Sequence, residues 1–435
     1  MLDTHQIVIV GGGAGGLELA TGLGNSLGRK RAAHITLVDR SPTHLWKPLL
    51  HEVAAGSMDR HAHQLNYLAQ AHWHHFTFCC GALDGIERGR KRVSVAPTRD
   101  AAGAEVIPRR EIAYDTLVIA IGSVTNDFGA AGVFEHAFRL DHAEDAERFH
   151  LQLINTCARK NFGPPENRVF NIAIIGGGAT GVELAAELHN TTRLLAAYGL
   201  EHFNPGRDIR IQLFNADPRI LPMLPERIAS ATTSALRDLG IDVRCGEQVV
   251  EVGKDFVRNN AGMVFTSDLT VWAAGVRASR HLADIGGLET NRANQLVVLP
   301  TLVTTRDPDI FAIGDCAACP REGHSGNIPP TAQASHQQAS HMQRTIRRRL
   351  HGRPPEPYRY RDYGSLISLG EYSTIGTLMG FISGKSLRVE GMYAKLMYLS
   401  LYKLHLWALH GFFKMALDAV GQSIRRRIGP RVKLH

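Results

Sequence analysis

The stretch IVIVGGGAGGLELA, residues 7–20, decides the fold. An apolar run, Ile7–Val10, leads directly into a glycine-rich turn, and apolar residues then recur at helical spacing over Leu17–Leu27. A second apolar run, Ile35–Val38, ends at the carboxylate of Asp39. Strand, glycine turn, helix and strand in this order predict a βαβ unit at the start of an α/β protein.

The glycine turn has the spacing G-x-G-x-x-G, which suits a bound dinucleotide. Gly11 permits the tight turn, Gly13 lets a pyrophosphate approach the backbone, and Gly16 lets the helix pack closely on the strand. The phosphates then lie on free N–H groups at the start of the helix. Asp39 is placed to accept hydrogen bonds from ribose hydroxyls. We therefore predict a dinucleotide site here.

The same unit occurs a second time, which predicts a second dinucleotide site rather than a repeat array. Its last strand ends in an amide, Asn215, where the first unit has a carboxylate. Its parts are the strand Ile172–Ile175, the turn glycines Gly176, Gly178 and Gly181, the helix Val182–Leu195 and the strand Ile209–Phe214.

Two residues of the second unit leave alternatives open. Glu183, in the first helical turn, either stabilises the helix end or acts near a nicotinamide. Asn215 can bond ribose hydroxyls, but it lacks the charge that repels a 2′-phosphate. Arg219 nearby either contacts such a phosphate or is a solvated loop residue. Both NADH and NADPH therefore remain candidate donors.

Three further runs resemble strands: Asp115–Gly122 (DTLVIAIG), Leu269–Gly275 (LTVWAAG) and Asp309–Asp315 (DIFAIGD). The last delivers Asp315 to the carboxyl edge of a parallel sheet, where ligands bind. Its carboxylate either accepts from a ribityl hydroxyl of FAD or caps a helix.

A helix is predicted to begin after Pro329 and Pro330. Gln333 and Gln337 are four residues apart and share one face of it. Their amides could bond a quinone carbonyl, although such pairs also occur on solvated helices.

Composition narrows the class of protein. The chain has 435 residues, 44% hydrophobic and 21% charged, which is typical of a globular enzyme of several domains. Six irregularly spaced cysteines are too few for a disulfide scaffold, and we expect no metal site. We find no signal peptide and no spanning segment. The net charge is +8, but its surplus lies in the tail, which argues against a nucleic-acid partner.

The tail from Val389 onward is basic and amphipathic. It holds eight Lys or Arg residues against two acidic ones. Its apolar residues recur at helical spacing, so we expect an interfacial helix, or two helices broken near Gly411, lying in lipid headgroups. The cluster Arg425–Arg427 would then meet anionic lipid. The alternative is a helix that forms a dimer or docks on the core.

Together these motifs resemble the two-dinucleotide-domain flavoproteins, and more narrowly the bacterial type II NADH dehydrogenases, which are NADH:quinone oxidoreductases that do not pump protons. The resemblance covers essentially the whole chain. The matching stretches are His44–Gly56 (HLWKPLLHEVAAG), Ile174–Leu188, Arg219–Arg227 (RILPMLPER), Gly314–Pro320 (GDCAACP), Ala332–Gln337 (AQASHQ), LHGFFK and the closing PRVKLH.

The resemblance implies an α/β fold in which a Rossmann-like NADH domain is inserted into a Rossmann-like FAD domain, followed by amphipathic membrane-binding helices. It implies residues 1–125 and 281–380 for the FAD domain, 126–280 for the NADH domain and 381–435 for membrane anchoring. It also implies a peripheral position on the cytoplasmic face of the bacterial inner membrane. A monomer and a homodimer both fit.

The resemblance also assigns residues to sites. Glu183, Gln333 and Gln337 would be catalytic, the two glutamines at the quinone and Glu183 also at NADH. The loop Lys47–Glu52 would lie near the isoalloxazine. The family usually has Glu where this chain has Asn215. The FAD residues would be Gly11, Gly13, Ala14, Gly15, Gly16, Asp39, Arg40, Lys47, Gly122, Gly314, Asp315 and Ala332. The NADH residues would be Gly176, Gly178, Thr180, Gly181, Glu183, Asn215 and Gly275.

Rival functions make different demands on the sequence. A disulfide reductase or a sulfide:quinone reductase needs cysteines beside the flavin, and Leu45–Met58 contains none. A reductase of a soluble iron–sulfur protein gives no reason for the basic, lipophilic tail. A membrane-associated redox sensor would bind the dinucleotides without turnover, and only kinetics separates it from an enzyme.

Overall fold

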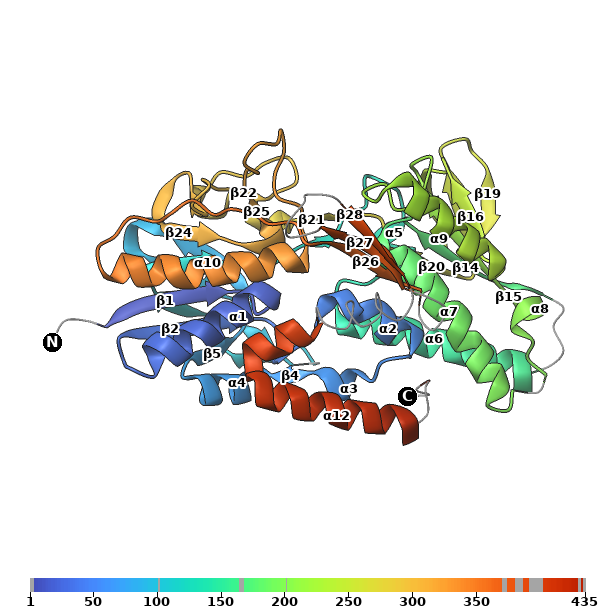
Figure 1. Ribbon diagram of the computed structural model, residues 1–435, viewed down its shortest axis with the longest axis horizontal. Coiled ribbons are helices and arrows are strands. Elements are labelled where there is room, and N and C mark those ends of the chain that lie inside the picture. The colour runs from blue at the N-terminus through green and yellow to red at the C-terminus, as the bar shows by residue number, and fades with distance from the viewer. Residues whose placement is uncertain are drawn as a thin grey trace.

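The computed structural model describes residues 4–100, 102–163, 168–200, 202–369, 374–379, 386–390, 402–428 and 432. The molecule is elongated and has two lobes, each built on a parallel sheet (Figure 1). A small three-stranded sheet lies between the lobes, and a C-terminal helix runs along one edge.

The first lobe holds a six-stranded sheet in the order β23-β24-β11-β1-β2-β5. All neighbouring strands are parallel except the edge pair β23 and β24. Buried Val, Ile and Leu fill the central strands, as expected for a parallel sheet covered on both faces. The strands are β1 (His5–Val10), β2 (Ala33–Asp39), β5 (Thr77–Cys80), β11 (Thr116–Ile119), β23 (Val303–Thr304) and β24 (Asp307–Ala312).

The second lobe holds a five-stranded parallel sheet in the order β13-β20-β14-β15-β16. All its strands come from one continuous stretch of chain, whereas the first sheet takes strands from before and after that stretch. The prediction of one Rossmann-like domain inserted into another is therefore confirmed. The strands are β13 (Ala137–Arg139), β14 (Phe170–Ile175), β15 (Ile209–Asn215), β16 (Asp242–Cys245) and β20 (Leu269–Trp272).

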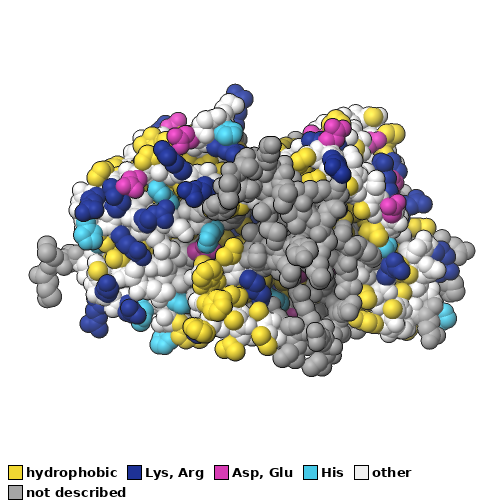
Figure 2. All heavy atoms as spheres, viewed as in Figure 1, with side chains coloured by type: hydrophobic (Ala, Val, Ile, Leu, Met, Phe, Trp, Pro, Cys, Tyr) yellow, Lys and Arg dark blue, Asp and Glu magenta, His cyan; other side chains and the backbone are white. Residues whose placement is uncertain are grey.

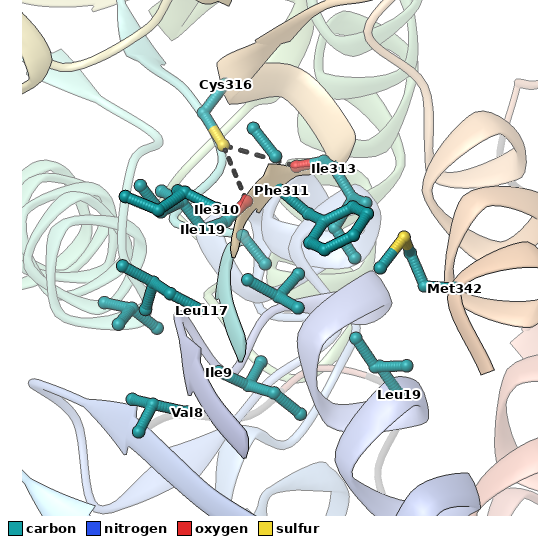
Figure 3. Packing of buried hydrophobic residues seen from close by; sticks show 14 of the residues in the cluster. Val8, Ile9, Leu19, Leu117, Ile119, Ile310, Phe311, Ile313, Cys316 and Met342 are labelled. Carbon is teal, nitrogen blue, oxygen red and sulfur yellow. Dashed lines mark hydrogen bonds between the residues drawn. The ribbon is translucent and has the colours of Figure 1, made fainter. Parts of the chain in front are cut away.

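Helices α1 (Ala14–Leu23) and α10 (Ala332–Leu350) lie side by side against the first sheet (Figure 1). Figure 3 shows the core beneath them, where Leu19 of α1 and Met342 of α10 point toward Phe311 of β24. Since α10 comes from the last third of the chain, segments from before and after the inserted domain share one core.

The charged segment 88–110 contributes to an antiparallel sheet of β6 (Leu83–Glu87), β7 (Arg92–Val95) and β10 (Arg110–Ala113). Val93 and Val95 are fully buried, so one face of it packs on the core. A matching sheet of β17 (Val249–Val252), β18 (Phe256–Asn259) and β19 (Val264–Thr266) occurs in the second lobe.

The expected loop Lys47–Glu52 is helical, and that expectation was wrong. A 3-10 turn, Lys47–Leu49, leads into α2 (Leu50–Ala55). Pro48 near the start favours helical backbone there, and Gly56 ends the helix in the left-handed conformation. Helix α2 packs against α6 (Ala143–Phe162) and α7 (Ala179–Ala197), so it joins the two lobes.

The C-terminal region begins differently from the expectation. Val389 lies in a strand, β28 (Ser386–Glu390), which pairs with β27 (Thr374–Met379), itself paired with β26 (Gly364–Ser368). The expected start of the amphipathic tail at Val389 was wrong, because cross-strand pairing sets the backbone there. Lys395, Arg431 and Lys433 lie outside the described residues.

Two helical segments follow, so of the two arrangements expected for the tail, the one with a break near Gly411 is confirmed. Residues 402–410 are helical, Gly411 adopts a left-handed backbone with φ of 78°, and α12 (Phe412–Ile428) follows. In the described part of the chain, every helix is too short or too polar to cross a bilayer.

Candidate functional site

In the first glycine turn, the protein's own packing requires glycine at two positions, whereas a third glycine faces open space. Gly11 has a φ of +104°, and a Cβ there would lie 2.4 Å from the carbonyl oxygen of Ala120. A Cβ on Gly16 would lie 1.8 Å from the Gly11 oxygen. A Cβ on Gly13 would meet no atom within 4 Å. Gly13 is therefore the point where a ligand can approach the backbone.

The second glycine turn repeats this geometry. Gly176 has a φ of +119°, a Cβ on Gly181 would lie 1.9 Å from the Gly176 oxygen, and Gly178 faces open space. Gly13 and Gly178 are also the N-caps of α1 and α7, and neither helix has a side-chain cap. The first N–H groups of both helices are thus available to phosphate, and both turns fit a dinucleotide.

Asp39 closes the first turn from the end of β2. Its Oδ2 accepts a hydrogen bond from the N–H of Gly12 at 2.6 Å, and its Oδ1 accepts from Ser41 N–H at 2.8 Å. Burial raises the pKa of the Asp39 carboxyl, and these two N–H donors oppose that effect. The residue both supports the turn and offers a carboxylate at the ligand edge.

Asn215 closes the second turn in the corresponding way. Its Oδ1 accepts from the N–H of Gly177 at 3.0 Å. Its Nδ2 donates to the carbonyl oxygens of Asp217 and Arg219, at 3.1 and 2.8 Å. The amide is 7% exposed, and both of its ends are used within the protein. Its main visible role is to hold the loop after β15.

Asp315 lies at the end of β24, as expected, and connects to other parts of the first domain. Its Oδ2 accepts from Ser123 Oγ at 2.7 Å. Lys47 donates to the Ser123 carbonyl oxygen at 2.9 Å, so the start of α2 reaches the same corner. Gly314, with a φ of +72°, donates its N–H to Gln338 Oε1 at 2.6 Å. Gln338 thereby joins α10 to this loop.

The remaining residues expected at the two nucleotides lie on the same two sheet edges. Gly122 and Gly275 follow β11 and β20 with positive φ. Thr180 is exposed in the first turn of α7, and Ala332 begins α10. Arg40 follows β2 and bonds to the ring of His142 at 3.2 Å. Because all these strands are parallel, their carboxyl ends gather the residues of each set on one edge.

Glu183 lies where the two lobes meet. It is 6% exposed, and its Oε1 accepts from the backbone N–H of Ser368 at 3.0 Å. Its Oε2 is 3.7 Å from Nδ1 of His51 on α2. Burial lowers the pKa of His51 to about 4, so this imidazole is neutral at neutral pH. Glu183 is thus held by elements of the first domain although it belongs to the second.

A cavity of about 1100 Å³ opens beside α10. Its walls come from α1, α2, α10, the segment 356–363 and the tail helix 402–410. Apolar and aromatic side chains such as Trp46, Leu49, Tyr358 and Leu404 line it. It is large enough for a ring compound with part of an apolar chain.

Both expected glutamines line this cavity, and their amides also hold its wall. Gln333 Oε1 accepts from Tyr363 N–H at 2.7 Å. Gln337 Oε1 accepts from Arg361 N–H at 3.0 Å, while its Nε2 donates to the Arg361 carbonyl oxygen at 2.7 Å. The pair therefore fixes the segment 361–364 along the helix.

A buried polar chain beside the cavity was not anticipated. His336, Glu18, His405 and His44 are linked in this order, and His44 in turn bonds to the carbonyl oxygen of Gly12 at 3.0 Å. The sequence held one signal for this chain of residues: Glu18 lies between apolar residues of a predicted helix, and a buried carboxylate requires partners. Its partners lie too far along the chain for local patterns to show.

The sequence profile of the pyridine nucleotide-disulphide oxidoreductase family matches residues 5–339. A type II NADH:quinone oxidoreductase of Haemophilus influenzae is 42% identical over 99% of this chain and 100% of its own length. One from Staphylococcus aureus is 28% identical over 88% of this chain and 92% of its own. The solved structure of NDH2 from Plasmodium falciparum in complex with NADH covers 99% of this chain and 100% of its own, with a TM-score of 0.81 at 18% identity.

Proposed function

The chain belongs to the pyridine nucleotide-disulphide oxidoreductase family, and we propose that its two nucleotide units and its cavity divide the work of a type II NADH:quinone oxidoreductase. The chain is an FAD-dependent enzyme that takes electrons from NADH and passes them to a quinone. The predicted activity, cofactor and donor are thereby confirmed.

We assign FAD to the first unit and NADH to the second. The observation that carries this division is the pair of matching turns, each with an open central glycine at an uncapped helix start. Asp39 and Asp315 offer carboxylates to the hydroxyls of FAD. FAD, when bound, accepts two electrons and releases them to the next acceptor. Gly176, Gly178, Gly181 and Asn215 then hold NADH, and Glu183 borders the region between the lobes.

We assign the quinone to the cavity beside α10. The lining is mostly apolar, which suits a lipophilic substrate, and it includes Gln333 and Gln337. The first turn of α10 adjoins the same Gly314–Asp315 corner, because a Cβ added to Gly314 would lie 3.1 Å from Ser335 Oγ. The cavity therefore borders the FAD unit on one side and the tail helix on the other.

A cavity-filling variant tests this assignment. Ser340 lines the cavity, so Ser340→Trp should occupy the space of the quinone. We expect the rate with a short-chain quinone to fall about tenfold or more, while reduction of ferricyanide, a small hydrophilic acceptor, continues. Ser230→Trp, at an exposed site on α9 (Glu226–Asp238), is the matched control. Equal loss with both acceptors would contradict the assignment.

We also propose that the enzyme associates peripherally with the cytoplasmic face of the membrane. Large apolar side chains gather along the tail helices: Trp407, Phe412, Phe413, Leu417 and Val420 are 50%, 57%, 81%, 74% and 59% exposed. Figure 2 shows a hydrophobic area where Figure 1 places α12. Trp73 of α4 (Tyr67–His74) adds to this face, with Lys414 over its ring at 5.1 Å.

Vesicle binding tests the membrane proposal. Sedimentation with vesicles containing anionic lipid should carry down the wild-type enzyme. The double variant Phe413→Glu and Leu417→Glu should stay in solution and keep its activity with water-soluble quinone. Met223→Glu, an 89% exposed residue of the second lobe, is the control. Retained binding by the double variant would contradict the proposal.

The domain limits form part of the proposal. We keep residues 1–125 and 126–280, and the second part of the FAD domain from 281. Strands β27 and β28 pair across the expected limit at residue 380, so we place the start of the membrane-binding region after Glu390.

A further inference from the structure

Glu18 is a buried carboxylate whose two oxygens are each bonded to a histidine. It lies on α1 and is 4% exposed. Its Oε2 is 2.5 Å from Nδ1 of His336 on α10, and its Oε1 is 2.6 Å from Nδ1 of His405 on the tail helix. These bonds lower the pKa of Glu18 against the opposing effect of burial, so the carboxylate is ionised.

The hydrogen-bond network assigns both ring protons to His405. The carbonyl oxygen of Gly12 only accepts, so Nδ1 of His44 donates to it at 3.0 Å. Burial lowers the pKa of His44 to about 3, so His44 is neutral and its Nε2 accepts. Nε2 of His405, 3.0 Å away, must then donate, while its Nδ1 donates to Glu18. This assignment pairs a doubly protonated His405 with the Glu18 carboxylate.

His336 is the other partner of Glu18, and it faces the cavity. Its side chain is 41% exposed and forms part of the cavity wall. Nδ1 is bonded to Glu18, and among the described residues Nε2 has no hydrogen-bond partner. The bond to Glu18 raises the pKa of His336 above its usual 6.5, against the effect of burial. Protonated His336 therefore presents an N–H on the cavity side, and its bond to Glu18 favours this form.

Other charged groups share this wall. Besides Glu18 and His405, they are Glu52 of α2, His63 of the short helix α3 (Arg60–His63), His341 and Arg344 of α10, Lys403 of the tail helix and the charged residues of segment 356–361. Of these groups, only Glu18 contributes to the shifted pKa of His336.

We propose that His336 donates a proton to the quinone during its reduction, and that Glu18 and His405 hold it in place for this step. The proposal rests on the assignment of the cavity to quinone. NADH supplies two electrons and one hydrogen nucleus, whereas a quinol has two new O–H bonds. The overall reaction, NADH plus quinone plus H⁺ giving NAD⁺ plus quinol, therefore needs one proton from solvent.

The proton moves through the imidazole without any net change in it. The Nε2–H bond of His336 breaks as an O–H bond forms on the quinone oxygen. Water at the cavity mouth then returns a proton to Nε2. His336 is the proton donor, and Glu18 is a positioning residue because it acts only through the imidazole.

His336→Asn tests the step in the holoenzyme. The Asn amide keeps an N–H donor near the position of Nδ1, so the bond to Glu18 is retained, but the titratable proton is lost. After reduction by NADH, recovery of the flavin absorbance is followed with a short-chain quinone, and separately with ferricyanide, which accepts electrons without protons. His351→Asn, at the exposed end of α10 outside the cavity wall, is the matched control.

We expect His336→Asn to slow recovery by quinone about 100-fold, within the usual range of general acid catalysis. Reduction by NADH, recovery by ferricyanide and the apparent affinity for quinone should stay within about twofold. In the wild type the quinone step should slow as pH rises through the pKa of His336, and this inflection should vanish in His336→Asn alone. Imidazole added to His336→Gly should restore part of the rate.

Other results would overturn the proposal. A wild-type rate and pH inflection in His336→Asn would show that another group donates the proton. Equal losses with quinone and ferricyanide would show a structural effect. If the wild type itself recovered with ferricyanide but not with quinone, the assigned acceptor would be wrong, which is a separate failure of the proposed function.

Discussion

Asn215 does in the second nucleotide unit what Asp39 does in the first. Asp39 accepts from the N–H of Gly12 at 2.6 Å, and Asn215 accepts from the N–H of Gly177 at 3.0 Å. The two side chains thus support equivalent turns, but only one carries a charge. The difference separates the structural role of this position, which an amide performs, from electrostatic selection among donors.

Asn215→Asp should make the enzyme more selective for NADH. The added carboxylate repels a 2′-phosphate, so the rate of flavin reduction by NADPH, relative to NADH, should fall about tenfold or more. The substitution also removes two donors, to the carbonyl oxygens of Asp217 and Arg219, and places negative charge beside them. We therefore expect about 1–3 kcal/mol of lost stability. An unchanged ratio of the flavin-reduction rates with NADPH and NADH would show that residue 215 does not contact the ribose.

The open glycine of the second turn allows ligand binding to be tested apart from folding. In Gly178→Ala the new Cβ meets no protein atom within 4 Å. The variant should fold and retain FAD, yet bind NADH at least about tenfold more weakly. Gly181→Ala, whose Cβ would lie 1.9 Å from a carbonyl oxygen, should instead destabilise the domain. Titration of NADH and thermal unfolding distinguish the two, and normal NADH affinity in Gly178→Ala would contradict the assigned site.

Glu18→Gln should be among the more damaging single substitutions outside the glycine turns. It removes the negative charge and one acceptor oxygen from a buried pair with His405, and breaking a buried ion pair typically costs about 3–5 kcal/mol. Chemical denaturation of the holoenzyme measures this loss. Glu322→Gln, in an exposed pair with Arg359, should change stability little. Equal effects of the two substitutions would contradict the proposed charge pairing.

His51 should make the protein less stable in mild acid. Its folded pKa, about 4, lies below the unfolded value of 6.5, so the unfolded chain binds more protons between these values. The contribution of His51 to the free energy of unfolding is therefore fully present above pH 6.5 and is lost as the pH falls toward 4. This loss amounts to about 2 kcal/mol between pH 7 and pH 5. His51→Asn keeps a donor for the Pro48 carbonyl and should reduce the pH-dependent loss by that amount. The same loss of stability in both proteins would show that folding does not lower the pKa of His51.

Local patterns predicted much of the fold. The strand expected at Ile7–Val10 is β1, and the helix expected at Val182–Leu195 lies within α7, because apolar periodicity and glycine spacing act over a few residues. The break at Gly411 was also visible, since a left-handed backbone favours glycine. The roles assigned to individual residues came from resemblance, and they remain proposals.

What the sequence did not reveal depends on distant partners. Glu18 and His405 come from opposite ends of the chain, and nothing near either one indicates the other. The amphipathic tail was expected to begin at Val389, but pairing with β27 makes this residue part of a strand. The glutamines were expected to face a quinone, and only the structure shows their amides bonded to the backbone of residues 361–364.

Stopped-flow mixing of the purified holoenzyme tests the central claim most directly. NADH should bleach the flavin absorbance rapidly, and a short-chain quinone added next should restore it, in repeated cycles. That result establishes both half-reactions on one flavin. Bleaching by NADH without recovery by any quinone would contradict the assignment of the acceptor, and no bleaching at all would leave a protein that binds dinucleotides without turnover.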